Sequence, residues 1–285
     1  MTDRAASAIV TGGGTGIGRR IAERLVQDGY LVTIMGRREE PLRATQAALG
    51  DRVSYVVGSV TAEDEIELAV ERADDRAPLR VAVLAAGTGG RYARLDSTPL
   101  RSWQRVFATN LDGAFLTLRA SAPRIARNGG GSVVAVSSVA AVRPHHGMAA
   151  YAISKAALEA LVVNGANELG DEGVRVNAVR AGIVDTDMTA GLYDDGSFVV
   201  RQLGETPIGR LGAATDLADA VSFLVSPQAS WITGVCLAVD GGNHLRGTVE
   251  LGDLPDVSRR PPRDGGAAAG AAEHPADPAR VARTL

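Results

Sequence analysis

The chain is poor in cysteine, aromatic side chains and long apolar runs, and these shortages exclude whole classes of structure. Cys236 is its single cysteine, which excludes an intramolecular disulfide and a thiolate-rich metal site. It stands in an apolar run, 235–239, that is typical of a buried strand. The four histidines show no metal-ligand spacing, and two of them, His145 and His146, are adjacent in a predicted loop where they are either solvated or in contact with a substrate. We expect no metal.

The chain also lacks a basic excess. A formal net charge of −3 and a pI near 5.9 leave no electrostatic footprint for nucleic acid. No apolar run approaches the ~20 residues that cross a bilayer, and the first residues contain no signal-peptide region, so we expect no membrane partner and a cytoplasmic location. The 285 residues, 45% of them hydrophobic, predict one folded domain over 1–245.

Two side chains with catalytic potential stand four residues apart in a strongly helical run. Tyr151 and Lys155 share one helix face at that spacing. A free tyrosine has a pKa of about 10, and a fixed positive charge nearby favours the phenolate, so the pair could act as acid and base. Ser138 follows the apolar run 132–136, and a hydroxyl at the end of a strand could hydrogen-bond a substrate oxygen. Alone, such a pair would more often be two surface neighbours.

A glycine-rich turn follows the first candidate strand, residues 7–10, and precedes a helical pattern over 21–26. Glycine allows a tight turn and a close approach of the backbone to a ligand, and a helix start directs unpaired N–H groups at phosphate. The candidate contacts to a dinucleotide are Gly12, Gly14, Thr15, Gly16, Ile17 and Gly18. Their spacing differs from the Gly-x-Gly-x-x-Gly fingerprint of longer dehydrogenases.

The order of these features resembles the short-chain dehydrogenase/reductase family over residues 5–245, in particular its 3-oxoacyl-acyl-carrier-protein reductase-like members. The glycine turn, Asn110, Ser138, Tyr151 and Lys155 follow one another through alternating strands and helices. The resemblance implies an α/β fold, a single Rossmann domain whose doubly wound, seven-stranded parallel sheet carries helices on both faces. It also implies hydride transfer between NADP(H) and a carbonyl or secondary alcohol substrate.

In that reaction the resemblance gives each polar residue a role. Tyr151 is the general acid/base, and Ser138 hydrogen-bonds the substrate oxygen. Lys155 favours the tyrosinate and binds the nicotinamide ribose, while Asn110 lies in a helix whose backbone deviates to hold a water linked to the lysine. Two rival functions remain: an NAD-dependent alcohol dehydrogenase, and a dinucleotide-binding sensor without turnover.

The end of the second candidate strand, 31–35, bears on the choice of cofactor. An acidic residue there binds the ribose hydroxyls of NAD and repels the extra phosphate of NADP. This chain has Arg37 and Arg38 instead, and guanidinium groups pair well with phosphate. NADP(H) is therefore favoured and NAD(H) stays possible, since both arginines could simply be solvated at a helix start.

Elsewhere the chain departs from the family's pattern. Ser59, before Val60, stands where an aspartate usually contacts the adenine. Ala85 replaces the asparagine of an Asn-Ala-Gly turn, so another group must satisfy the lost hydrogen bond. The two residues that follow it, Ala86 and Gly87, leave room for the adenosine ribose and phosphates.

The loop after the sixth candidate strand has Ala181 where relatives have proline. Gly182, Ile183 and Thr186 keep the positions that would hold the nicotinamide carboxamide. Residues 187–204 are predicted to form a variable lid that closes over the substrate. Their side chains show no recognisable chemistry, so the identity of the small-molecule substrate stays open.

The helix predicted over 149–169 has more apolar surface than packing on one sheet requires. In relatives it builds a four-helix subunit interface, so the resemblance implies a homotetramer, with a dimer as the next alternative. From residue 246 the composition shifts to proline, glycine and alanine without aromatic residues. Such a segment cannot bury enough apolar area to order itself, which predicts a flexible tail over 246–285.

Overall fold

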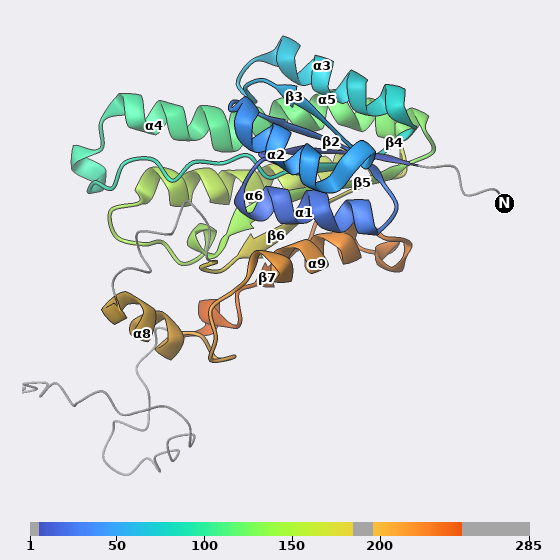
Figure 1. Ribbon diagram of the computed structural model, residues 1–285. Coiled ribbons are helices and arrows are strands. Elements are labelled where there is room, and N and C mark those ends of the chain that lie inside the picture. The colour runs from blue at the N-terminus through green and yellow to red at the C-terminus, as the bar shows by residue number, and fades with distance from the viewer. Residues whose placement is uncertain (1–5, 185–195, 247–285) are drawn as a thin grey trace, which may run out of the picture. The chain divides into compact units, whose positions relative to one another are not determined.

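The computed structural model describes residues 6–184 and 196–246, which belong to one compact unit. Its centre is a seven-stranded sheet in the order β3-β2-β1-β4-β5-β6-β7 (Figure 1), and every strand pair is parallel. The strands are β1 Ser7–Thr11, β2 Leu31–Gly36, β3 Val53–Val57, β4 Leu79–Leu84, β5 Gly131–Ser138, β6 Val174–Ala181 and β7 Cys236–Val239. The predicted fold class is confirmed.

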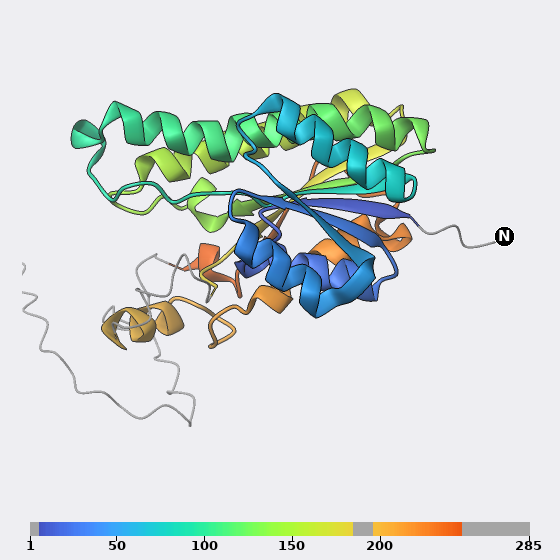
Figure 2. The ribbon, with the colours of Figure 1, turned by 45° about the horizontal axis from the view of Figure 1, so that its top comes forward.

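Helices cover both faces of the sheet, as Figure 2 shows with α1, α2 and α9 below it and α3, α5 and α6 above it. All five residues of β1 are buried, because a parallel sheet covered on both faces needs apolar side chains on both. The helices are α1 Gly16–Gln27, α2 Glu39–Leu49, α3 Glu63–Arg76, α4 Leu100–Phe107, α5 Gly113–Arg127, α6 Ala149–Leu169, α8 Gly196–Gly204 and α9 Ala214–Val225.

Two apolar cores hold these layers together. One joins α3, α5 and α6 to the sheet through side chains such as Ile66, Leu118 and Leu158. The other joins α1, α2 and α9 to the opposite face and includes Ile21 and Leu217. Because the strand order reverses between β1 and β4, the helices after these strands diverge and leave a crevice at the carboxyl edge of the sheet.

The helical region that contains Asn110 is divided at this residue. α4 ends at Phe107, residues Ala108–Asp112 form a π-helical turn, and α5 begins at Gly113. Such a turn contains one extra residue and changes the direction of the side chains it carries. Asn110 is 1% exposed and points into the protein.

The strand of Cys236 is not the buried strand that its sequence predicts. β7 pairs with β6 alone and forms one edge of the described sheet, and each of its four residues is only half-buried. Burial nonetheless raises the pKa of the Cys236 thiol to about 11, so the thiol is protonated and unreactive near neutrality.

Two predicted segments fall partly or wholly outside the described residues. Of the predicted lid, 196–204 forms α8, and 187–195 lies outside the description. Of the predicted tail, only Arg246 is described. Within 6–184 and 196–246, none of the helices combines the length and apolar character that crossing a bilayer requires.

Candidate active site

A cleft runs along the carboxyl edge of the sheet, where β1 and β4 diverge. It consists of two adjoining hollows that share Gly12, Thr15, Ala86 and Gly87. The arginine hollow, of about 570 Å³, contains Arg37 and extends over the ends of β2 and β3. The tyrosine hollow, of about 220 Å³, contains Ser138, Tyr151 and Lys155 at the ends of β5 and β6.

The glycine turn forms the floor between the two hollows. Gly12 adopts a φ of +70°, and a Cβ there would lie 3.0 Å from the backbone nitrogen of Ala86. A Cβ on Gly18 would lie 2.3 Å from the carbonyl oxygen of Gly12, so only glycine allows α1 to start this close to the turn. Of the predicted contacts, Gly14 lines the arginine hollow, and Gly16, Ile17 and Gly18 line the tyrosine hollow. This backbone suits a pyrophosphate.

Three arginines line the arginine hollow. Arg37 and Arg38 follow β2, as the sequence predicts, and Arg105 joins them from α4. Sequence reasoning missed Arg105, because nothing in a surface helix indicates which cleft a residue on it will face. The cationic lining fits a ligand with phosphate groups.

Ser59 and Val60 also line the arginine hollow. The Ser59 hydroxyl forms a 2.8 Å hydrogen bond with Thr61, and its N–H donates to the Glu65 carboxylate at 2.6 Å. A carboxylate therefore does reach the end of β3, from the first turn of α3 rather than from position 59.

Thr11 holds the backbone of the turn in which Ala85 stands in the place of an asparagine. Its hydroxyl accepts from the backbone N–H groups of Ala85 at 3.2 Å and Ala86 at 3.3 Å, and it donates to the carbonyl oxygen of Val83 at 3.3 Å. The turn that lines both hollows is thus held from β1. In the sequence, this role of Thr11 is indicated only by a single hydroxyl side chain at the end of an apolar strand.

Asn110 holds the loop that follows β4. Its Oδ1 accepts from the Thr88 N–H at 2.8 Å, while its Nδ2 donates to the Thr88 carbonyl oxygen and to the Ser154 hydroxyl, each at 3.0 Å. A Cβ on Gly87 would lie 3.6 Å from both Asn110 Oδ1 and Lys155 Nζ. The amide and the ammonium therefore converge on the same point of the cleft wall.

Lys155 lies beneath the tyrosine hollow and is 5% exposed. Its Nζ donates to the carbonyl oxygen of Val136 at 2.7 Å and lies 5.8 Å from the centroid of the Tyr151 ring. Burial lowers the pKa of Lys155 to about 8, and the carboxylate of Glu159 opposes that effect. The lysine can therefore exchange a proton near physiological pH.

Tyr151 differs from the sequence-based expectation in its ionisation. The lysine was expected to favour the phenolate, but burial raises the pKa of Tyr151 above its ordinary value, and the hydrogen bond with Ser138 only partly offsets this. The ammonium lies over the ring face rather than against the oxygen, so desolvation of the phenolate prevails. The phenol is consequently protonated at neutral pH and suited to donate its proton.

The loop after β6 closes one end of the tyrosine hollow. Gly182 donates its N–H to the Val239 carbonyl oxygen at 3.1 Å, and a Cβ there would lie 2.8 Å from the Cα of Asp240. Gly182 also borders a neighbouring hollow of about 440 Å³ that Ile183 lines. Thr186 lies outside the described residues, so its predicted contact stays a prediction.

The two loop histidines lie apart from this cleft. His146 is exposed, and partial burial lowers the pKa of half-buried His145, with Arg143 contributing to the same effect. Neither lines the arginine or the tyrosine hollow. Across the described part of the chain, no group of three or more histidine, cysteine or acidic side chains could hold a metal ion.

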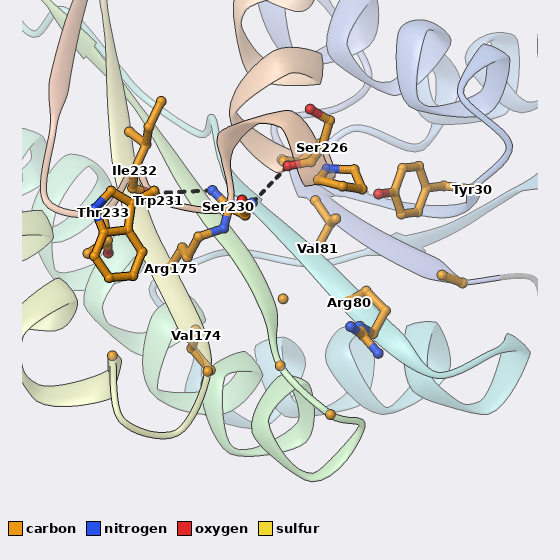
Figure 3. Close-up of a pocket in the computed structure, with 18 residues that line it drawn as sticks. Tyr30, Arg80, Val81, Val174, Arg175, Ser226, Ser230, Trp231, Ile232 and Thr233 are labelled. Carbon is orange, nitrogen blue, oxygen red and sulfur yellow. Dashed lines mark hydrogen bonds between the residues drawn. The ribbon is translucent and has the colours of Figure 1, made fainter.

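A cavity larger than either hollow, of about 830 Å³, lies at the opposite edge of the sheet, where β4, β5 and β6 begin. Figure 3 shows Arg175 there, with hydrogen bonds to the carbonyl oxygens of Ser226 and Ile232 at 3.3 Å. Its guanidinium holds the loop before β7, and no predicted site residue reaches this cavity. A search for the active site by cavity volume alone would therefore point to the wrong edge of the sheet.

Comparison with known proteins agrees with this cleft. The sequence model of a family described as enoyl-(acyl carrier protein) reductase matches residues 12–244. Dehydrogenase/reductase SDR family member 4 of Oryctolagus cuniculus is 34% identical over 243 residues, which span 84% of this chain and 94% of that protein.

Solved structures show the same similarity. A short-chain dehydrogenase/reductase from Mycobacterium ulcerans superposes with a TM-score of 0.83 at 32% identity, covering 88% of this chain and 94% of that one. The 3-ketoacyl-(acyl-carrier-protein) reductase of Brucella melitensis, complexed with NADH, has a TM-score of 0.79 at 29% identity and covers 84% and 98%. Because the family model matches residues 12–244 and a relative that is 34% identical is covered over 94% of its length, the chain belongs to the short-chain dehydrogenase/reductase family of NAD(P)-dependent oxidoreductases.

Proposed function

We propose that this protein transfers a hydride between NADP(H) and a carbonyl or secondary alcohol substrate. The observation that carries the proposal is the convergence of Ser138, Tyr151 and Lys155 on the hollow that adjoins the glycine turn. The nicotinamide cofactor supplies or accepts the hydride. The protein supplies position, hydrogen bonds and a proton.

In the reducing direction, Tyr151 donates its phenolic proton to the oxygen on which negative charge develops. Its raised pKa keeps that proton available at neutral pH. The Ser138 hydroxyl, within hydrogen-bonding reach of the phenol, donates to the same oxygen and stabilises the charge. In the oxidising direction the tyrosinate accepts the proton from the alcohol.

Lys155 restores the protonation state of Tyr151. Its ammonium, held by the Val136 carbonyl oxygen, stabilises the phenolate once the proton has left. Asn110 fixes the Thr88 backbone beside the lysine, and a water held by the helix backbone at Asn110 would relay protons to Nζ. Gly182 and Ile183 would orient the carboxamide of the cofactor, together with Thr186.

The arginine hollow supports a preference for NADP(H). Arg37, Arg38 and Arg105 line the place where the adenosine end of a dinucleotide would lie, and guanidinium groups recognise a phosphate monoester there. NAD(H) is the alternative, and the Brucella melitensis reductase was solved with NADH.

A panel of carbonyl and alcohol compounds tests the proposal, with NADPH or NADH followed at the nicotinamide absorbance. The panel includes β-ketoacyl thioesters, polyketide-like ketones, sugars and steroids. Tyr151→Phe is expected to abolish turnover while NADPH still binds with little change by fluorescence titration. The matched control is Tyr55→Phe, whose hydroxyl contacts Glu39 at the surface. Full turnover by Tyr151→Phe would remove the phenol from the chemistry, and binding without turnover on the whole panel would favour the sensor.

We also propose that the protein assembles as a homotetramer. Large apolar side chains are exposed along α5 and α6, among them Phe115, Ile153 and Val163, which are 44%, 44% and 51% exposed in the single chain. A partner subunit on this face would bury them. The cytoplasmic location and the flexibility of the tail over 246–285 stay predictions.

A further inference from the structure

A partly buried ion pair lies one helical turn beyond Lys155 on the same face of α6. Glu159 follows Lys155 at the spacing at which Lys155 follows Tyr151, so the three side chains share one helix face. The Glu159 carboxylate accepts from Arg180 Nε at 2.9 Å and from Nη2 at 2.6 Å. The side chains of Glu159 and Arg180 are only 13% and 16% exposed.

The same carboxylate is attached to the strand that carries the catalytic serine. Ser137, the neighbour of Ser138 in β5, donates its hydroxyl proton to Glu159 Oε1 at 2.7 Å. Ser137 and Arg180 are direct partners in the β5–β6 register, which explains why both reach Glu159.

Consecutive residues of β5 therefore hold consecutive turns of α6. Val136 binds Lys155 through its carbonyl oxygen, Ser137 binds Glu159, and the hydroxyl of the next residue, Ser138, hydrogen-bonds the Tyr151 phenol. Movement of Glu159 would thus displace the strand end and the helix that position the reacting groups. The Glu159 carboxylate also acts electrostatically on Lys155.

We propose that Glu159 and Arg180 are positioning residues whose two opposite charges set how firmly Lys155 holds its proton; the consequence for catalysis rests on the function proposed above. The carboxylate favours the ammonium form, and the guanidinium offsets part of that effect. In a buried site the dielectric constant is low, so charges one helical turn apart interact strongly.

Other titratable groups face this pair, from α6 and from the strands packed against it. Tyr151 is protonated and neutral, and Cys236 on β7 is neutral because its pKa is raised to about 11. Asp240, which follows β7, acts on Arg180 and is itself bound by His244 at 2.7 Å. The Glu159 carboxylate acts on Lys155 directly, and Arg180 acts through the carboxylate that it binds.

Charge removal therefore has opposite consequences at the two positions. Glu159→Gln removes the carboxylate and leaves a cation, so Lys155 should lose its proton at lower pH. Arg180→Gln removes the cation and leaves the carboxylate, so Lys155 should keep its proton to higher pH. The double variant removes both charges and should return close to the wild type.

The sequence offers a direct probe, because Lys155 is the only lysine among the 285 residues. Protein labelled with ¹³C,¹⁵N-lysine gives a single lysine side-chain signal. This signal can be titrated from about pH 6 up to about pH 10.5, which is close to the ordinary pKa of lysine. The experiment needs neither cofactor nor substrate, so its failure is distinguishable from a failure of the proposed function.

We expect the midpoint of the Lys155 titration to fall by ~0.5–1 pH unit in Glu159→Gln and to rise by a smaller amount in Arg180→Gln. Glu67→Gln, which breaks the Arg124–Glu67 pair between α5 and α3, is the matched control and should leave the midpoint unchanged. Midpoints that move in the same direction, or that do not move, would overturn the proposal.

Arg180→Gln leaves the partly buried Glu159 carboxylate without its ionic partner, which is destabilising. A second test applies where this variant does not fold. Glu159→Gln and the double variant then test the proposal. Glu159→Gln must lower the midpoint of the Lys155 titration, and the double variant must restore it to the wild-type value. Where a substrate from the panel is turned over, the pH midpoint of kcat/KM should follow the same order as the lysine signal.

Discussion

Lys155 Nζ lies 2.7 Å from the carbonyl oxygen of Val136, so strand β5 holds an ammonium group that burial disfavours. The pKa of Lys155 is about 8 in the folded protein against an ordinary value of 10.5. The unfolded chain therefore binds this proton more tightly than the folded one. It follows that the lysine lowers the free energy of unfolding below about pH 8, and that this penalty disappears as the pH rises to about 10.5.

Lys155→Met tests this linkage. Relative to the variant, the wild type should gain about 2–3 kcal/mol in free energy of unfolding between pH 7 and pH 10.5, at ~1.4 kcal/mol for each unit of pKa shift. Urea unfolding of both proteins at several pH values measures the difference, in which the titrations common to both cancel. A difference independent of pH would contradict the lowered lysine pKa.

Asn110→Ala should destabilise the fold by about 2–4 kcal/mol. The substitution leaves the Thr88 N–H and carbonyl group without their partner and removes the bond to Ser154, all in a buried place. Asn164→Ala on the exposed side of α6 is the matched control and should change stability by less than about 0.5 kcal/mol. Equal midpoints in urea for the two variants would show that the Asn110 clamp is dispensable.

Arg37→Ala and Arg105→Ala should weaken NADPH binding about 10-fold or more and leave NADH binding nearly unchanged. Each removes a cation that would pair with the additional phosphate of NADPH. Fluorescence titration with both nucleotides measures the two dissociation constants. Arg101→Ala, an exposed position on α4 outside the arginine hollow, serves as the control. Parallel losses for the two nucleotides would remove the basis for NADP(H) selectivity.

Ser138→Ala should lower kcat about 100-fold and hardly alter the affinity for NADPH, because a hydrogen bond to the developing oxyanion is lost. Ser132→Ala removes a hydroxyl from the same strand far from the cleft, where it contacts the Leu224 carbonyl oxygen, and should retain turnover. Steady-state kinetics with a substrate from the panel measures kcat for both variants. Comparable kcat values for both variants would exclude Ser138 from transition-state stabilisation.

Ile153→Glu and Val163→Glu should dissociate the proposed tetramer into smaller species, because a charge in an apolar interface is costly to desolvate. Leu68→Glu on α3 replaces a residue that is 56% exposed elsewhere on the surface and should leave the assembly intact. Light scattering coupled to size exclusion gives the mass of each protein. A monomeric wild type would refute the tetramer directly.

Local patterns in the sequence determined most of the architecture. Apolar runs located the strands, and the helix of Tyr151 and Lys155 was predicted over the residues that it occupies, Ala149–Leu169. The glycine turn was recognisable because tight turns before a helix restrict the residue type itself. These features depend on residues that are close together along the chain, so they can be recognised from the sequence itself.

Tertiary structure decided what depends on burial and on residues distant in sequence. Thr11 binds the backbone of Ala85, 74 residues away, and Arg105 meets Arg37 only because α4 and the end of β2 border the same hollow. Burial raised the pKa of Tyr151 where spacing alone predicted the reverse. Desolvation and strand register arise only when the chain has folded, so no local pattern could have disclosed them.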